Sequence, residues 1–148
     1  MGLPKILLVD DNRPVLECRQ VTLKRAGFIV MAADSGLSAL RIAQSEKPDV
    51  VVTDIRMAGM DGYELCRKVR ELYEVPVILY SAYDLSEEHQ NAARAVGAAV
   101  VLTSACRIDE LVQAIRSLLR EEKEMDPSPS AGVLPALPAP ASVGSGRV

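Results

Sequence analysis

Three aspartates stand at the ends of two short apolar runs. Asp10 and Asp11 directly follow the run Ile6–Val9. Asp54 closes a second run, which begins at Val50. If the two runs are neighbouring parallel strands, their carboxyl ends meet at the edge where open α/β sheets bind ligands. Three carboxylates at close range repel one another without a cation, and Mg²⁺ accepts carboxylate ligands while keeping several waters. With Mg²⁺ present, one carboxylate can attack a phosphoryl group and form an aspartyl phosphate.

A third apolar run places a hydroxyl group in the same way. Ser81 follows Val77–Tyr80, and the small Ala82 comes next. If this strand lies beside the one that ends at Asp54, the Ser81 hydroxyl can donate a hydrogen bond to a phosphoryl oxygen. Ala82 would leave room for a phosphodonor. Ser81 therefore joins the candidate site.

Each of these residues also has an ordinary structural explanation. An aspartate at a strand end is often a cap or turn residue, and Asp11 or Asn12 could cap the following helix. Gly59 and Gly62, which come after Asp54, could serve a turn that needs positive φ. The chemical interpretation depends on the whole set, in this order and at the ends of these strands.

Apolar runs rich in β-branched residues alternate with helical segments along most of the chain. The runs lack polar alternation, which is typical of parallel strands covered on both faces. They are Ile6–Val9, Ile29–Ala32, Val50–Val52, Val77–Tyr80 and Val100–Leu102. The helical segments are marked by caps, terminating glycines or an apolar stripe. They run from about Pro14 to before Gly27, over Gly36–Ser45, over about Gly62–Tyr73, from Ser86 to before Gly97, and over Ile108–Lys123. This βα series predicts an open α/β sheet with helices on both faces.

Four strings resemble the receiver domain of bacterial two-component response regulators, a likeness that covers about Lys5–Arg120. They are ILLVDDN at Ile6–Asn12, DVVVTDIRMAGMDGYEL at Asp49–Leu65, PVILYSA at Pro76–Ala82 and VGAAVVLT at Val96–Thr103. The resemblance implies a flavodoxin-like, doubly wound five-stranded parallel sheet with strand order 2-1-3-4-5 and five flanking helices.

The resemblance also implies a role for each candidate residue. Asp54 takes the position of the phosphoacceptor. Asp10 and Asp11 would hold Mg²⁺ together with Asp54, and the backbone carbonyl of Arg56 would be a further ligand. Ser81 takes the Thr/Ser position that binds the phosphoryl group and switches. The phosphodonor of the family is a phosphohistidine on a sensor histidine kinase or phosphotransfer protein.

The sequence departs from the family pattern around the fifth strand. Ser104 replaces the usual lysine and Ala105 the usual proline. Loss of the lysine bears on the lifetime of the phosphate and on its coupling to a change of shape. A cis bond costs about 2.5–4 kcal/mol before Ala but only about 0.5–1 before Pro, so we expect a re-routed loop. Val101 replaces the usual aromatic switch residue, and Arg107 is a candidate substitute for the lysine.

Composition excludes several classes of function. The net charge is −3 without a basic cluster, which argues against nucleic-acid binding. No apolar stretch reaches membrane-spanning length, and the N-terminus does not read as a signal peptide, so we expect a cytoplasmic protein without membrane contact. Three separated cysteines indicate neither a disulfide framework nor a zinc site. The single histidine, His89, lies in a polar helical stretch and is expected at the surface.

The composition changes near Met125. We predict a receiver domain over residues 1–124 and a disordered tail rich in Pro, Ala and Ser over residues 125–148. The tail is too short to fold as an output domain.

Three functions fit these residues. The first is a single-domain receiver that accepts phosphate on Asp54 and signals through the face around the fourth helix, fifth strand and fifth helix, as a monomer or weak dimer. It would catalyse at most its own phosphorylation and dephosphorylation. The second is a phosphate-independent interaction module, which the missing lysine and aromatic residue favour. The third is a Mg²⁺-dependent aspartyl phosphatase. That chemistry usually needs a general acid two residues after the nucleophile. Asp54 has Arg56 there and Asp10 has Asn12, which argues against the phosphatase.

Overall fold

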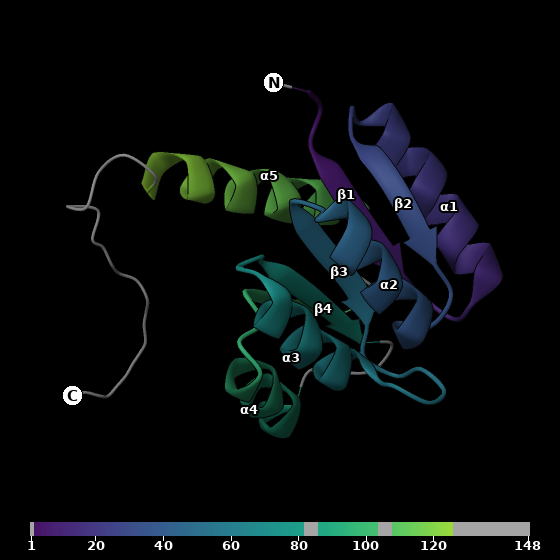
Figure 1. The fold of residues 1–148 in the computed structure, drawn as a ribbon, viewed down its shortest axis with the longest axis vertical. Coiled ribbons are helices and arrows are strands. Elements are labelled where there is room, and N and C mark those ends of the chain that lie inside the picture. Colours follow the sequence, from purple (N-terminus) through teal and green to yellow (C-terminus); the bar gives the residue numbers. More distant parts are fainter. Residues whose placement is uncertain (1, 82–85, 104–107, 126–148) are drawn as a thin grey trace. The chain divides into compact units, whose positions relative to one another are not determined.

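The computed structural model describes residues 2–81, 86–103 and 108–125. Within these ranges, five strands alternate with five helices, as the sequence predicts (Figure 1). The strands are β1 (Lys5–Val9), β2 (Ile29–Ala33), β3 (Val50–Asp54), β4 (Val77–Ser81) and β5 (Val100–Thr103). The helices are α1 (Arg13–Arg25), α2 (Gly36–Glu46), α3 (Gly62–Leu72), α4 (Glu87–Ala95) and α5 (Ile108–Met125).

The strands form one parallel sheet in the order β2-β1-β3-β4-β5. The flavodoxin-like order predicted from the sequence is therefore confirmed. Val9 of β1 pairs with Thr53 of β3, and Asp54 pairs with Tyr80 of β4. Asp10 and Asp54, each one residue further along its strand direction, thus lie level with each other at the carboxyl edge of the sheet.

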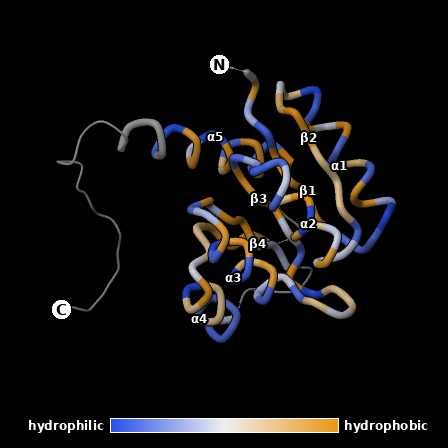
Figure 2. The backbone as a smooth tube through the Cα atoms, viewed as in Figure 1, coloured by the Kyte–Doolittle hydropathy of each residue, from blue (hydrophilic) through white to orange (hydrophobic). Residues whose placement is uncertain are grey.

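Helices α2 and α3 lie in front of the sheet in Figure 1 and cover one of its faces. Their apolar side chains form a buried cluster with alternate residues of the three central strands. Figure 2 shows these strands as the most continuous hydrophobic part of the chain. The cluster includes Leu7, Val9, Val51, Val77 and Leu79 from the strands, Ala39 and Ala43 from α2, and Leu65, Cys66 and Val69 from α3.

Helix α1 contacts β1 and β2 and covers the opposite face. Residues that alternate with the first cluster, such as Leu8 and Tyr80, are buried on this side. Leu16 and Leu23 are the buried apolar residues of α1. The guanidinium carbon of Arg19 in α1 lies 4.3 Å from the centre of the Tyr80 ring, so α1 also covers the end of β4.

Side-chain caps define the starts of four helices. The side chains of Asn12, Ser35, Asp61 and Ser86 each accept a hydrogen bond from a backbone N–H in the first turn of α1, α2, α3 and α4. The helix starts predicted at Gly36 and Gly62 are confirmed, with Ser35 and Asp61 as their caps, and Asn12 rather than Asp11 caps α1. These caps fix where each chain segment leaves the sheet edge and turns into its helix.

The chain divides into two units within α5, the first ending at Ile115 and the second beginning at Arg116. The first contains all five strands, α1 to α4 and the start of α5, where Leu111 and Ile115 are buried. The second contains the rest of α5. Residues 126–148 lie outside the described residues, so the predicted tail remains a prediction. Among the described residues, no helix is long and apolar enough to cross a membrane.

Candidate functional site

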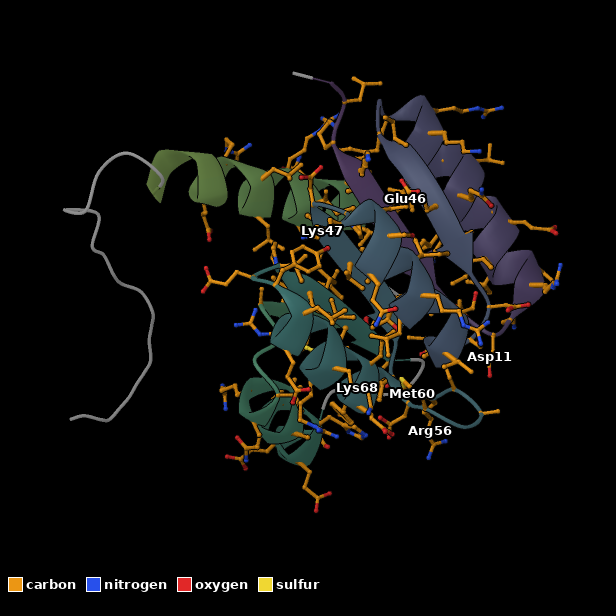
Figure 3. The ribbon with its side chains drawn as sticks, in the orientation of Figure 1. Asp11, Glu46, Lys47, Arg56, Met60 and Lys68 are labelled. Carbon is orange, nitrogen blue, oxygen red and sulfur yellow. The ribbon has the colours of Figure 1, made fainter. Side chains whose placement is uncertain are left out.

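Asp10, Asp11 and Asp54 meet at the carboxyl edge of the sheet. Each offers a carboxylate oxygen, and these oxygens all lie within 4.8 Å of one another. Asp10 is buried, Asp54 is half-buried and Asp11 is exposed, so the cluster opens to solvent on one side. Figure 3 shows Asp11 and Arg56 at the same end of the molecule, opposite Glu46 at the end of α2. The sequence-based expectation that the three aspartates converge is thus met in the structure.

Asp10 is held by a hydrogen bond on each carboxylate oxygen. Its Oδ1 accepts from the backbone N–H of Asn12 at 2.9 Å, and its Oδ2 accepts from the Tyr80 hydroxyl at 2.7 Å. The side chain is 3% exposed. A carboxylate this deeply buried is costly unless it is hydrogen-bonded, and these two donors satisfy it.

Asp11 joins β1 to the loop that follows β3. Its Oδ2 accepts a hydrogen bond from the backbone N–H of Ala58 at 3.2 Å. The carboxylate therefore fixes the loop that leads away from Asp54, and it also belongs to the acidic cluster.

Asp54 carries the clearest electrostatic perturbation in the site. Burial raises the pKa of its carboxyl from 3.8 to about 6, and the negative charge of Asp10 adds to this effect. Hydrogen bonds from the backbone N–H groups of Arg56 and Ile55 lower the pKa in part. The charged form of Asp54 is thus held beside like charges in a partly desolvated place. A bound cation would stabilise it.

The loop after Asp54 depends on two glycines for different reasons. Gly59 has a φ of +76°, which confirms the turn predicted there. The same expectation for Gly62 is wrong, because Gly62 is the first helical residue of α3 and has no positive φ. It is needed for space: a Cβ atom there would lie 2.8 Å from the Cα of Ile55 and would collide with the carbonyl oxygen of Asp54.

An open cavity of about 540 Å³ adjoins the cluster. Asp11, Arg56, Asp61, Tyr63 and His89 are among its lining residues. The sequence places His89 at the surface, whereas the structure shows it half-buried, with its Nδ1 2.7 Å from the Ser86 hydroxyl. Of the three clustered carboxylates, Asp11 is the one that lines this cavity.

Ser81 is the last residue of β4 and is 2% exposed. It directly follows Tyr80, the register partner of Asp54, so its backbone lies at the same sheet edge. Val101 of β5, the residue in the place of the family's aromatic, is partly buried and packs against the core cluster. The positions Ala82, Ser104, Ala105 and Arg107 lie outside the described residues.

Sequence reasoning missed the part played by Tyr80, which it treated only as one residue of an apolar strand. The hydroxyl contacts Asp10, and the ring is 2% exposed. The one available signal was a hydroxyl-bearing side chain beside the strand end in an otherwise aliphatic run. Its target could not be read from the sequence, because it depends on strand register and on the rotamer.

Comparison with known proteins agrees with this geometry. Residues 6–116 match the family model of the response regulator receiver domain. The chain is similar to the chemotaxis protein CheY4 of Vibrio cholerae, with 28% identity and a TM-score of 0.75 over 79% of this chain and 99% of that chain. It is also similar to a CheY-like receiver domain protein of Methanospirillum hungatei JF-1, with 26% identity and a TM-score of 0.77 over 83% and 99% of the two chains. A receiver domain protein from Clostridium thermocellum gives 26% identity and a TM-score of 0.78 over 83% and 99%.

Proposed function

The chain belongs to the response regulator receiver family, and on that premise we propose that it accepts a phosphoryl group on Asp54. The observation that carries this proposal is the cluster of three carboxylates within 4.8 Å, in which Asp54 has a raised pKa. A partly desolvated carboxylate among like charges is the arrangement expected where a cation and an anionic phosphoryl group are to be bound in turn.

The residues present fit Mg²⁺. The donor set consists of hard carboxylate oxygens, which this ion prefers, and the cluster is open on the side of Asp11, which leaves room for the waters that Mg²⁺ retains. Asp10, Asp11 and Asp54 would hold the ion, with the backbone carbonyl of Arg56 as a further ligand. When bound, Mg²⁺ would neutralise the charge that gathers on the transferring phosphoryl oxygens.

The chain's own part in the transfer is nucleophilic attack and positioning. A carboxylate oxygen of Asp54 attacks the phosphorus of a phosphohistidine on a histidine kinase or phosphotransfer protein. The new P–O bond forms as the P–N bond breaks, and the leaving imidazole keeps the electron pair and takes a proton from solvent. The Ser81 hydroxyl would donate a hydrogen bond to a phosphoryl oxygen.

A downstream protein would read the signal at the face that includes α4 and β5. A cavity of about 330 Å³ lies there, lined by residues of both elements and of the connection between them, including Arg94, Ala98 and Val101. We propose this cavity as part of the partner surface.

A second function is favoured by Val101. A valine packed against the core cluster cannot make the inward swing of an aromatic side chain. A chain of this kind could bind its partner in the same way with or without phosphate. It would then act as a constitutive interaction module.

The deciding experiment is phosphorylation with Mg²⁺ and acetyl phosphate, followed by intact mass. We expect a gain of one phosphate that requires Mg²⁺, is released by hydroxylamine as an acyl phosphate should be, and is absent in Asp54→Asn. Asp34→Asn is the matched control, since Asp34 is an exposed aspartate at the end of the neighbouring strand β2 that pairs with Arg13 and is not one of the three clustered carboxylates. Phosphorylation that persists in Asp54→Asn would contradict the proposal. If neither acetyl phosphate nor beryllofluoride modifies the wild type, the phosphate-independent module is the better account.

A further inference from the structure

Tyr80 reaches the acidic site from the face of the sheet that α1 covers. Its hydroxyl lies 2.7 Å from Oδ2 of Asp10 and 3.1 Å from the carbonyl oxygen of Val9. A phenol has one proton to donate, and the shorter contact leads to the charged acceptor, which forms the stronger hydrogen bond. The Tyr80 side chain therefore ends on the aspartate at the base of the site.

Two donors together leave the Asp10 carboxylate little freedom to rotate. The Asn12 N–H holds Oδ1 at 2.9 Å, and the Tyr80 hydroxyl holds Oδ2. Each carboxylate oxygen keeps a further lone pair, so the group is still able to bind a cation. The plane of the carboxylate is set before any ion arrives.

Tyr80 is itself held firmly enough to do this. The ring is almost fully buried, and Tyr80 is the register partner of Asp54 in β3. The guanidinium carbon of Arg19 lies 4.3 Å from the ring centre. The contact is thus a fixed hydrogen bond between two ordered side chains.

We propose that Tyr80 is a positioning residue that holds the Asp10 carboxylate in the orientation that Mg²⁺ requires. This inference rests on the proposed metal site. It assigns to β4 a role in metal binding through the residue before Ser81, and it makes α1 part of the same arrangement through Arg19. Partners that orient a metal ligand in this way commonly change metal affinity by about 10- to 100-fold when they are removed.

The choice of ion gives the role a signature. Mg²⁺ demands near-ideal octahedral geometry, whereas Ca²⁺ accepts a flexible and variable set of oxygen ligands. A carboxylate that is free to rotate should therefore reduce the affinity for Mg²⁺ more than the affinity for Ca²⁺. General damage to the site, or a simple change of charge, would reduce both affinities alike.

The test compares Tyr80→Phe with the wild type by calorimetric titration with Mg²⁺ alone and with Ca²⁺ alone. Phenylalanine keeps the ring and its packing and removes only the hydroxyl. Tyr73→Phe is the matched control, because the Tyr73 hydroxyl donates a 2.6 Å hydrogen bond to the Pro48 carbonyl, which follows α2 and precedes β3. We expect Tyr80→Phe to weaken Mg²⁺ binding by about tenfold and to lower the preference for Mg²⁺ over Ca²⁺. Tyr73→Phe should bind both ions like the wild type.

A measurement without metal tests the contact itself. In urea unfolding with EDTA present, Tyr80→Phe should reduce the folding equilibrium constant by about tenfold in the wild-type background and by less than twofold in the Asp10→Ala background. Equal losses in the two backgrounds would overturn the inference.

The titrations separate this inference from the function on which it rests. The role of Tyr80 alone is overturned if the wild type binds Mg²⁺ and folded Tyr80→Phe binds it with an affinity within twofold of the wild type. Equal weakening of Mg²⁺ and Ca²⁺ would overturn it as well. Wild-type protein that binds no Mg²⁺ would overturn the metal site and the inference together.

Discussion

The amide of Gly62 donates a 2.8 Å hydrogen bond to the carbonyl of Ile55, which ties the first residue of α3 to the residue that follows β3. This close approach is permitted by the missing side chain at Gly62, because a Cβ atom would meet backbone atoms of Asp54 and Ile55. The position of the proposed phosphoacceptor therefore depends on a residue with no chemical function of its own.

Gly62→Ala should destabilise the protein and disturb the site together. Backbone atoms cannot move aside as a flexible side chain can, so we expect a loss of about 1–3 kcal/mol in the free energy of unfolding, measured with urea. Gly36→Ala is the comparison, because Gly36 is also the first residue of its helix, but a Cβ atom there would lie 2.8 Å from the Cβ of Met60 and would not meet strand backbone, so we expect a smaller loss. If Gly36→Ala is as harmful as Gly62→Ala, the explanation by backbone contact is wrong.

The raised pKa of Asp54 predicts a pH dependence of stability. The pKa is about 6 in the folded protein and 3.8 in its ordinary state, so the folded chain binds more protons in this range. Stability should therefore fall as the pH rises from about 4 to 6 in the absence of metal. Asp54→Asn should remove this dependence.

The size of this effect is limited by solvent, because Asp54 is only half-buried. At pH 7.5 without metal we expect Asp54→Asn to be more stable than the wild type by about 1–2 kcal/mol, with a much smaller difference at pH 4. Urea unfolding at the two pH values measures both differences. A wild-type protein whose stability rises from pH 4 to 6 relative to Asp54→Asn would show that the sign is wrong.

Mg²⁺ should stabilise the folded chain through the acidic cluster. An ion that binds only the folded state adds about 2.7 kcal/mol at a concentration of about 100 times its Kd. Asp11→Asn should lose most of this gain, since Asp11 offers the exposed carboxylate of the cluster. Thermal unfolding with Mg²⁺ and with EDTA measures the gain, and Asp34→Asn should keep it. An equal response to Mg²⁺ in all three proteins would place the ion elsewhere.

The sequence predicts the layout of this protein better than its contacts. Strand positions follow from apolar runs, and the helix starts at Asn12, Ser35 and Asp61 follow from local capping, so both are encoded within a few residues. The meeting of Asp10 with Asp54 follows once β1 and β3 are neighbours. The contacts of Tyr80 and Gly62 are different, since they depend on register, on a rotamer and on how closely a helix approaches a strand.

Arg19 offers a test of how far the arrangement around Tyr80 extends. Its guanidinium lies 4.3 Å from the ring centre, a geometry that stabilises by about 0.5–1 kcal/mol when partly exposed. Arg19→Met keeps an unbranched chain over the ring but removes the charge, so we expect a loss of this size in urea unfolding. Arg41→Met, at an exposed position in the middle of α2, should change stability much less. In a Tyr80→Leu background the cost of Arg19→Met should disappear, because the aromatic face is gone. A cost that persists there would mean that Arg19 stabilises α1 by another contact and plays no part in holding Tyr80.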